Sequence, residues 1–257
     1  YGHNRHEKRA RHANNLPAAI MSRLQNIAEA ASSFFRPRFK ILAYHFVGPS
    51  VGGRYEITQR AFGEQMDYLK TSGFSVISLE RACEFMSAGG IPERCVVITF
   101  DDGHATLSEY ALPLLQSFGF PYTVFLPVDH VKERRAGIPV RREDKTDALT
   151  WEEIERLAGS GAAFGSHTMT HRALTSLSAP EMECELMESK KILDQRLHQN
   201  FVALAYPFGR YDQRVTDCAR RCGYSAGLSF GNVLSNAART DLLRLRREQI
   251  VASMDQA

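Results

Sequence analysis

The sequence predicts an α/β fold in which about seven parallel strands form one (β/α) barrel. Continuous apolar runs, such as Cys95–Phe100, alternate along the chain with segments of helical periodicity, such as Gln59–Thr71. Apolar strands of this kind are typical of a parallel sheet that is covered on both faces. The chain has 257 residues, a length that suits one barrel domain better than two small domains.

Strand-like and helical segments follow one another along the chain. Apolar runs occupy residues 39–47, 74–79, 95–100, 122–128, 162–165, 201–206, 224–230 and 242–251, and helical spacing occupies residues 59–71, 80–88, 105–118, 151–158, 180–197 and 212–222. Glycine follows four of these helices, at positions 73, 89, 119 and 223, as is typical of helix C-termini. Thr150, with Glu153 three residues later, forms a capping-box pattern at the start of its helix.

The chain divides into a basic N-terminal arm, residues 1–38, and a folded domain, residues 39–257. Residues 1–40 contain eight Lys or Arg side chains and two Glu side chains, and apolar residues recur at helical spacing from Leu16 to Ala31. We expect this arm to be either solvated or in peripheral contact with an anionic membrane surface. It is too polar to span a bilayer.

The amino-acid composition indicates which partners and which cellular location to expect for this protein. The formal net charge of +3 gives no reason to expect a nucleic-acid partner. The five cysteines are odd in number and suggest no disulfide framework, which favours a reducing compartment. No apolar segment typical of a secretory signal follows the basic start. We therefore expect a cytoplasmic location, at the inner-membrane surface if the arm binds lipid, or a periplasmic one if a signal segment precedes this sequence.

Two short motifs, each at the end of an apolar run, contain groups suited to metal-assisted hydrolysis. The first contains the adjacent carboxylates Asp101 and Asp102, and the second contains His167 and His171, four residues apart. Because the working residues of α/β barrels lie at the C-terminal ends of strands, we expect these side chains at one rim. One carboxylate and two imidazoles can hold a divalent metal ion with open positions, and the other carboxylate can act as a general base.

Each motif also has an ordinary structural explanation. An Asp-Asp pair before a residue such as Gly103 is common as a turn or helix start, and a His-x3-His pair often matches by chance. Their joint occurrence after two predicted parallel strands favours the catalytic interpretation. A third segment, Leu204–Gly209, again ends a strand. Its Pro and Gly form either a simple turn or a bend that directs a backbone N–H towards an oxyanion.

Together these segments resemble a known family. Residues 99–103, 166–171 and 205–209 are similar to the first three motifs of the polysaccharide deacetylases, the NodB-homology or carbohydrate esterase family 4 proteins. The resemblance extends over roughly residues 40–250 of the chain. It implies a distorted (β/α) barrel and the metal-dependent removal of N-acetyl groups from amino-sugar polymers.

The resemblance also implies a role for each motif residue. It makes Asp101 the catalytic base, and Asp102, His167 and His171 the ligands of one divalent metal ion, Zn²⁺ first and Co²⁺ or Ni²⁺ as alternatives. It makes the backbone N–H of Tyr206 the oxyanion donor. In the implied mechanism, water activated by the metal is deprotonated by Asp101 and attacks the acetamide carbonyl, and protonation of the amine then releases acetate.

The sequence departs from the family's motifs at three positions. Ala205 stands where many members have an Arg that orients the base, and His104 stands where many have Pro. No His follows His198, so the chain lacks the late Leu-x-His whose imidazole protonates the leaving amine. These departures affect the orientation of the base and the general acid, and they leave the metal ligands in place.

Residues elsewhere in the chain could fill both roles. The last strand carries Arg244, Arg246 and Arg247. We expect Arg247 to orient Asp101, although a run of charges also fits a solvated surface. His45, at the end of the first strand, is the expected acid and could instead be a satisfied core group. His104 is a second candidate, and Asp101 itself could return the proton that it accepts.

The expected substrate is an N-acetylhexosamine-containing bacterial polysaccharide. Tyr44-His45 and the AYPFG form of the third motif resemble a subgroup that modifies bacterial exopolysaccharide. The side chains expected to contact the substrate are Tyr206, Pro207, Phe208 and Trp151. Trp151 could instead anchor its own helix. The long polar connection at residues 129–149 could form a substrate-binding loop.

Two other functions fit the same residues. One is an amidohydrolase that opens a small cyclic amide or imide on the same scaffold, and it would need a closed pocket rather than an open groove with aromatic flanks. The other is a glycan-binding homologue with weak catalysis, to which the missing Arg and His of the family's motifs point. The sequence predicts no particular oligomeric state.

Overall fold

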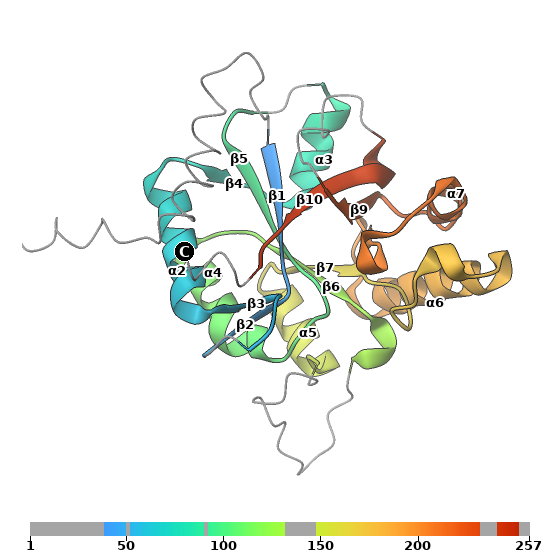
Figure 1. The fold of residues 1–257 in the computed structure, drawn as a ribbon, viewed down its shortest axis with the longest axis horizontal. Helices are drawn as coiled ribbons and strands as arrows, with labels where there is room; N and C mark the ends of the chain where they lie inside the picture. The colour runs from blue at the N-terminus through green and yellow to red at the C-terminus, as the bar shows by residue number, and fades with distance from the viewer. Residues whose placement is uncertain (1–38, 50–51, 90–91, 132–147, 232–240, 252–257) are drawn as a thin grey trace, which may run out of the picture.

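The computed structural model of the protein describes residues 39–49, 52–89, 92–131, 148–231 and 241–251. Seven parallel strands form a barrel in the order β1-β10-β9-β8-β7-β6-β5, and β5 pairs with β1 to close the ring (Figure 1). These strands are β1 (Phe39–Tyr44), β5 (Cys95–Phe100), β6 (Thr123–Leu126), β7 (Ala163–Ser166), β8 (Ala203–Ala205), β9 (Ala226–Phe230) and β10 (Leu245–Gln249). The barrel predicted from the sequence is confirmed.

Shorter strands and the helices complete the described fold. β4 (Ser75–Val76) pairs with the start of β5 outside the ring, and β2 (Phe46–Gly48) pairs with β3 (Glu56–Thr58) in a separate sheet. The α-helices are α2 (Gln59–Thr71), α3 (Leu79–Ser87), α4 (Leu112–Phe118), α5 (Trp151–Gly159), α6 (Ala179–Leu197) and α7 (Gln213–Arg221). The short helical turns are η1 (Leu107–Ala111), η2 (Val128–His130), η3 (Leu174–Ser176), η4 (Pro207–Gly209) and η6 (Leu242–Arg244). The helices α2 and α4 lie on the opposite side of the barrel from α6 and α7 (Figure 1).

Several predicted elements differ from the observed ones. The strand predicted at residues 74–79 is reduced to the two residues of β4, because α3 already begins at Leu79. The predicted strand 39–47 is interrupted at His45, which separates β1 from β2. The predicted helix 105–118 begins as the π-helical turn η1, because Pro113 has no N–H to donate to the Glu109 carbonyl in an α-helical bond. The predicted strand 242–251 begins as a 3₁₀ turn, since the Asp241 carboxylate accepts the Leu243 N–H at 3.0 Å.

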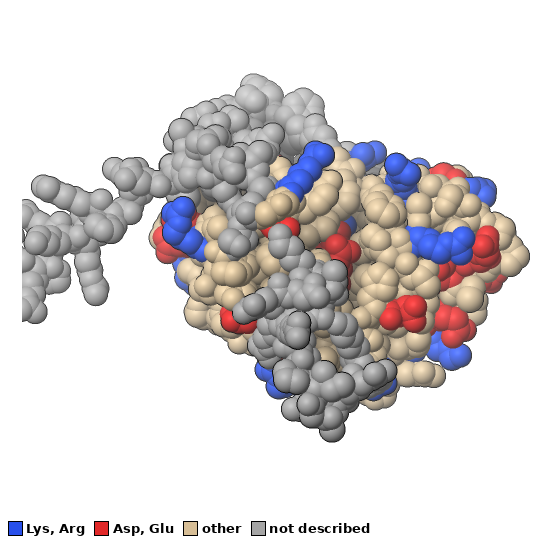
Figure 2. All heavy atoms as spheres, turned by 60° about the horizontal axis from the view of Figure 1, so that its bottom comes forward, with Lys and Arg blue, Asp and Glu red and all other residues tan. Residues whose placement is uncertain are grey.

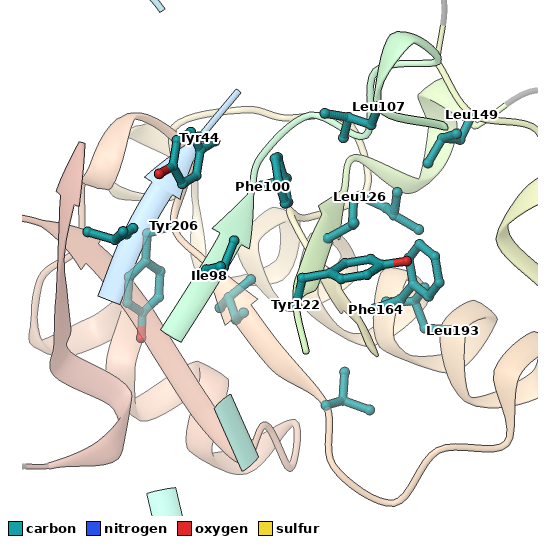
Figure 3. Packing of buried hydrophobic residues seen from close by; sticks show 14 of the residues in the cluster. Tyr44, Ile98, Phe100, Leu107, Tyr122, Leu126, Leu149, Phe164, Leu193 and Tyr206 are labelled. Carbon is teal, nitrogen blue, oxygen red and sulfur yellow. The ribbon is translucent and has the colours of Figure 1, made fainter. Parts of the chain in front are cut away.

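Strand alternation sorts the core into two layers. Successive residues of a strand face opposite sides of the sheet. One set of strand residues forms a cluster inside the barrel with residues of α3: Ile41, Val97, Phe125, Ala205, Leu228 and Leu245 with Leu79, Cys83 and Met86. The other set, which includes Tyr44, Ile98, Phe100 and Tyr206, packs with the remaining helices (Figure 3). The interior of the barrel is therefore filled by one set of alternate strand residues, which pack on α3.

The described surface carries side chains of both charges (Figure 2). On the face that Figure 2 shows, Lys and Arg side chains are interspersed with Asp and Glu side chains over the described surface. None of the helices in the described ranges has the length and apolarity that crossing a membrane requires. The N-terminal arm and residues 132–147 of the polar connection lie outside the described residues. The division at residue 38, the lipid contact, the location and the substrate-binding loop therefore stay predictions.

A substitution at Gly165 tests how tightly the barrel interior is packed. A Cβ at this position of β7 would lie 2.4 Å from Phe125 Cε1 and 2.8 Å from the Ala203 carbonyl oxygen. We expect Gly165→Ala to lower the free energy of unfolding by roughly 1–3 kcal/mol, measured by urea denaturation, because overpacking displaces its neighbours. The control is Gly159→Ala in α5, where a Cβ would meet nothing within 4 Å. Equal urea midpoints for the two variants would contradict this explanation.

Candidate active site

Asp101, Asp102, His167 and His171 meet at the C-terminal ends of β5 and β7. Each motif begins where its strand ends. The His167 Nε2 atom lies 4.0 Å from Asp101 Oδ2 and 3.7 Å from Asp102 Oδ1. The His171 Nε2 atom lies 3.5 Å from the same Asp102 oxygen. The structure therefore brings together the four side chains that the sequence singled out.

Asp102, His167 and His171 form a group that fits a divalent metal ion. Their three candidate ligand atoms lie within 4.8 Å of one another, and the two Nε2 atoms are 3.2 Å apart. The His167 Nδ1 atom donates to the Ala205 carbonyl oxygen at 2.7 Å, which leaves its Nε2 lone pair facing the other two ligands. Burial, followed by the neighbouring His167 imidazole, lowers the pKa of His171 and favours the neutral, metal-binding ring.

Several motif residues have left-handed backbone conformations. The φ angles are 67° at Asp102, 68° at Thr168 and 61° at His171, values that non-glycine residues rarely adopt. Gly103 follows with a φ of 60°, so the chain turns sharply after β5. This turn lets Asp101 enter the barrel while Asp102 stays at the rim. Such backbone strain often accompanies functional sites.

Asp101 and Arg247 form a buried, bidentate ion pair. The two guanidinium NH groups donate to Asp101 Oδ1 at 2.6 Å and Oδ2 at 2.7 Å, and one of them also donates to Thr99 Oγ1 at 3.2 Å. Both charged side chains have zero exposed surface. Burial alone would raise the pKa of Asp101, but the Arg247 guanidinium reverses this and holds the pKa well below its usual range. The carboxylate is therefore ionised and held in one orientation.

Strand alternation in β10 explains why only one arginine of the last strand enters the site. Leu245 and Arg247 are buried, whereas Arg246 between them is partly exposed. Arg244 lies before the strand and pairs with Asp241 at 3.5 Å. Arg247 occupies the place expected for the residue that orients the base, whereas Arg244 and Arg246 are partly exposed and contact other residues.

His45 lies beside the buried carboxylate of Asp101. Its Nε2 atom is 3.9 Å from Asp101 Oδ2, and its ring stacks on Tyr55 at 5.0 Å and on Phe230 at 6.1 Å between ring centroids. Burial is the main cause that lowers the pKa of His45, and the Asp101 carboxylate opposes it. The His45 ring therefore lies close to the Asp101 carboxylate, although 3.9 Å is too long for a direct hydrogen bond. Tyr55, which the sequence did not single out, covers one of its faces.

The prediction that the Tyr206 N–H binds the oxyanion is wrong. This N–H donates to the Leu228 carbonyl oxygen at 2.9 Å, as the pairing of β8 with β9 requires. Pro207 has no N–H, and those of Gly209 and Arg210 donate to carbonyls within the turn. The Phe208 N–H is the next donor, and it bonds to no carbonyl of the described residues. Phe208 also has a left-handed backbone, with a φ of 59°.

Three of the four side chains predicted to contact substrate are buried, so this part of the prediction is wrong. Tyr206 points out of the barrel and donates its hydroxyl to the Leu243 carbonyl oxygen at 2.8 Å, and Pro207 is buried in the turn. Trp151 is the first residue of α5, and its ring packs in the core below Arg196. Trp151 therefore anchors its helix, which was the alternative. Phe208 is exposed.

Comparison with known proteins agrees with this geometry. The polysaccharide deacetylase family matches residues 88–227 of the chain. The chain belongs to this family. A structure of the Streptococcus pyogenes deacetylase PplD in complex with acetate has a TM-score of 0.72 at 25% sequence identity, over 83% of this chain and 92% of that chain.

Two relatives known from their sequences are also similar. YxkH from Bacillus subtilis is 28% identical over 193 residues, which are 75% of this chain and 64% of YxkH. The poly-beta-1,6-N-acetyl-D-glucosamine N-deacetylase of Staphylococcus aureus is 25% identical in a match of 195 aligned positions that covers 72% of this chain and 65% of that protein. The chain thus spans slightly less than two thirds of the length of these relatives.

Replacing Arg247 tests the buried ion pair. Arg247→Met leaves the Asp101 carboxylate buried without its partner, so we expect a loss of about 3–5 kcal/mol in unfolding free energy at neutral pH. The guanidinium keeps the pKa of Asp101 low, so the pair stabilises the fold above the usual carboxyl pKa and less as the pH falls below it. The loss should therefore shrink in acid.

The measurement is urea denaturation at neutral and acidic pH, with Arg246→Met as the matched control on the outward face of β10. An equal loss in both variants, or a loss for Arg247→Met that does not change with pH, would contradict the assignment.

Proposed function

We propose that this protein is a metal-dependent deacetylase that removes N-acetyl groups from a bacterial polysaccharide of N-acetylhexosamine units. The observation that carries the proposal is the group of Asp102, His167 and His171 directly beside the buried Asp101. Family membership supports the reaction class. The relative from Staphylococcus aureus acts, by its name, on poly-beta-1,6-N-acetyl-D-glucosamine, and we propose a substrate of this type here.

The proposed cofactor is one divalent ion, Zn²⁺ in the first place and Co²⁺ or Ni²⁺ as alternatives, held by Asp102, His167 and His171. When bound, such an ion lowers the pKa of water and polarises a carbonyl group. Two imidazoles and one carboxylate leave positions open for water and substrate. The hydrogen bond from His167 to the Ala205 carbonyl fixes the ring that would face the ion.

Asp101 is the proposed general base. Its carboxylate is ionised, and the two hydrogen bonds from Arg247 hold it next to His167. It can accept the proton of the attacking water, and its low pKa makes it ready to release that proton again. His45, 3.9 Å away, can receive the proton and deliver it to the leaving amine. The Phe208 N–H is the proposed backbone donor to the oxyanion, in place of that of Tyr206.

Exposed aromatic rings favour a sugar polymer over a small cyclic amide. In the described residues, the exposed large hydrophobic side chains are Tyr55, Met187 and Phe208. Two of these three border the site, since Tyr55 stacks on His45 and the Phe208 ring lies 4.9 Å from that of His171. Aromatic rings at two sides of a site suit an open groove that binds pyranose rings.

The proposal is tested by acetate release from β-1,6-linked N-acetylglucosamine oligomers. The protein is stripped of metal, reloaded with Zn²⁺, Co²⁺ or Ni²⁺, and compared on β-1,4-linked oligomers. We expect release only after reloading, and faster release from the β-1,6-linked oligomers. Asp101→Asn should bind metal and lower kcat by roughly 10²–10⁴-fold, whereas Asp102→Ala should lose both metal and activity.

Other outcomes would change the proposal in defined ways. Metal binding without acetate release from either oligomer, but with hydrolysis of small cyclic imides, would replace the polysaccharide substrate. Glycan binding without any hydrolysis would indicate a binding protein. Full activity of Asp101→Asn would contradict the assignment of the base.

His45 allows a separate test of proton delivery. If His45 protonates the leaving amine, His45→Gln should lower kcat by roughly 10²–10⁴-fold and leave KM nearly unchanged. The measurement is initial rates over a range of substrate concentrations. His198→Asn at the exposed end of α6 is the control, because Asn tolerates the left-handed backbone at that position. An unchanged kcat for His45→Gln would exclude His45 from the proton transfer.

A further inference from the structure

We infer that Glu185 is a positioning residue for the metal site, because its carboxylate holds the loop that carries the two histidines. This inference rests on the proposed metal site. Glu185 lies in the first half of α6 and is only 6% exposed. Its Oε2 atom accepts the N–H groups of Met169 at 2.9 Å and Thr170 at 2.8 Å, and its Oε1 atom accepts the Thr170 hydroxyl. Both residues lie between His167 and His171.

The loop is also held on its other side. The Thr168 carbonyl oxygen accepts the Val128 N–H at 3.1 Å, and the Met169 carbonyl oxygen accepts the Asp129 N–H at 2.9 Å. The peptide groups of the loop thus donate to α6 and accept from the residues after β6. A segment bound on both sides can keep the left-handed backbone seen at Thr168 and His171, which would otherwise relax.

A second residue of α6 binds the start of the same segment. Ser189, one turn after Glu185, is fully buried and lies 2.9 Å from the Ser166 hydroxyl. The Ser166 hydroxyl in turn accepts the Thr168 N–H at 3.0 Å. Residues four apart on a helix share one face, so this face of α6 contacts the loop at two places.

The partners of Glu185 indicate that it acts through hydrogen bonds. In the described part of the chain, no Lys or Arg side chain forms an ion pair with Glu185. A buried carboxylate is unfavourable unless donors surround it, and its observed donors are two N–H groups and one hydroxyl of the loop. A side chain that only filled space at this position would need no charge. The carboxylate suits a role in fixing the backbone that separates the two imidazoles.

The experiment measures Zn²⁺ affinity of the metal-free protein with a chromophoric competitor, together with thermal unfolding without metal. We expect Glu185→Ala to bind Zn²⁺ roughly ten- to hundredfold more weakly, the range typical when a residue that supports metal ligands is removed. Glu185→Gln keeps an acceptor oxygen for the two N–H groups and should fall between Glu185→Ala and the unmodified protein. Glu183→Ala, at an exposed position of the same helix, should bind as the unmodified protein does.

Unchanged Zn²⁺ affinity in a folded Glu185→Ala variant would overturn the inference. If that variant does not fold, Glu185→Gln and Thr170→Val decide, because Thr170→Val removes only the hydroxyl bond. Weaker Zn²⁺ binding by both would support the positioning role, and unchanged binding by both would overturn it. If the unmodified protein binds no Zn²⁺, the proposed metal site itself fails. If it does bind Zn²⁺ and the variants bind equally well, only the role of Glu185 fails.

Discussion

The buried ion pair between Asp101 and Arg247 is the interaction around which the candidate site is arranged. The two residues are 146 positions apart in the sequence, and their strands, β5 and β10, are separated in the ring by β1. A carboxylate with no exposed surface would normally become neutral, but two charge-assisted hydrogen bonds keep this one ionised. The ion pair therefore keeps an ionised carboxylate in a fixed position inside the barrel, and His167 and His45 lie beside it.

Strand alternation decides which side chains face the barrel interior, where the Asp101 carboxylate lies. Asp101 and Arg247 continue the inward positions of their strands, as does Ala205 in β8. Ala205 stands where many family members have an arginine, and the guanidinium comes from β10 instead. Tyr206, the next residue of the chain, points outward into the layer between the strands and the helices. One position along a strand thus decides whether a side chain faces the barrel interior or the layer under the helices.

The site residues that the sequence predicted correctly are those that belong to short local motifs. Asp101 and Asp102 follow one strand and His167 and His171 follow another, and the rule that parallel strands end at one rim brings them together. The predictions about the backbone donor were wrong because they depend on how the strands pair. The register of Ala205 with Leu228 commits the Tyr206 N–H to the sheet and makes Phe208 the next donor. The direction of the Trp151 ring depends on how α5 packs, which periodicity does not reveal.

The sequence by itself determined the alternating fold, the barrel and the four side chains at its rim, because apolar periodicity and short motifs are local properties of the chain. The sequence favoured Arg247 as the residue that orients Asp101 and left a solvated surface as the alternative, and only the tertiary structure decided between the two. The tertiary structure likewise decided that Glu185 binds the loop between the two histidines. These contacts join residues far apart in the sequence, and their geometry depends on strand register and helix packing that no single segment encodes.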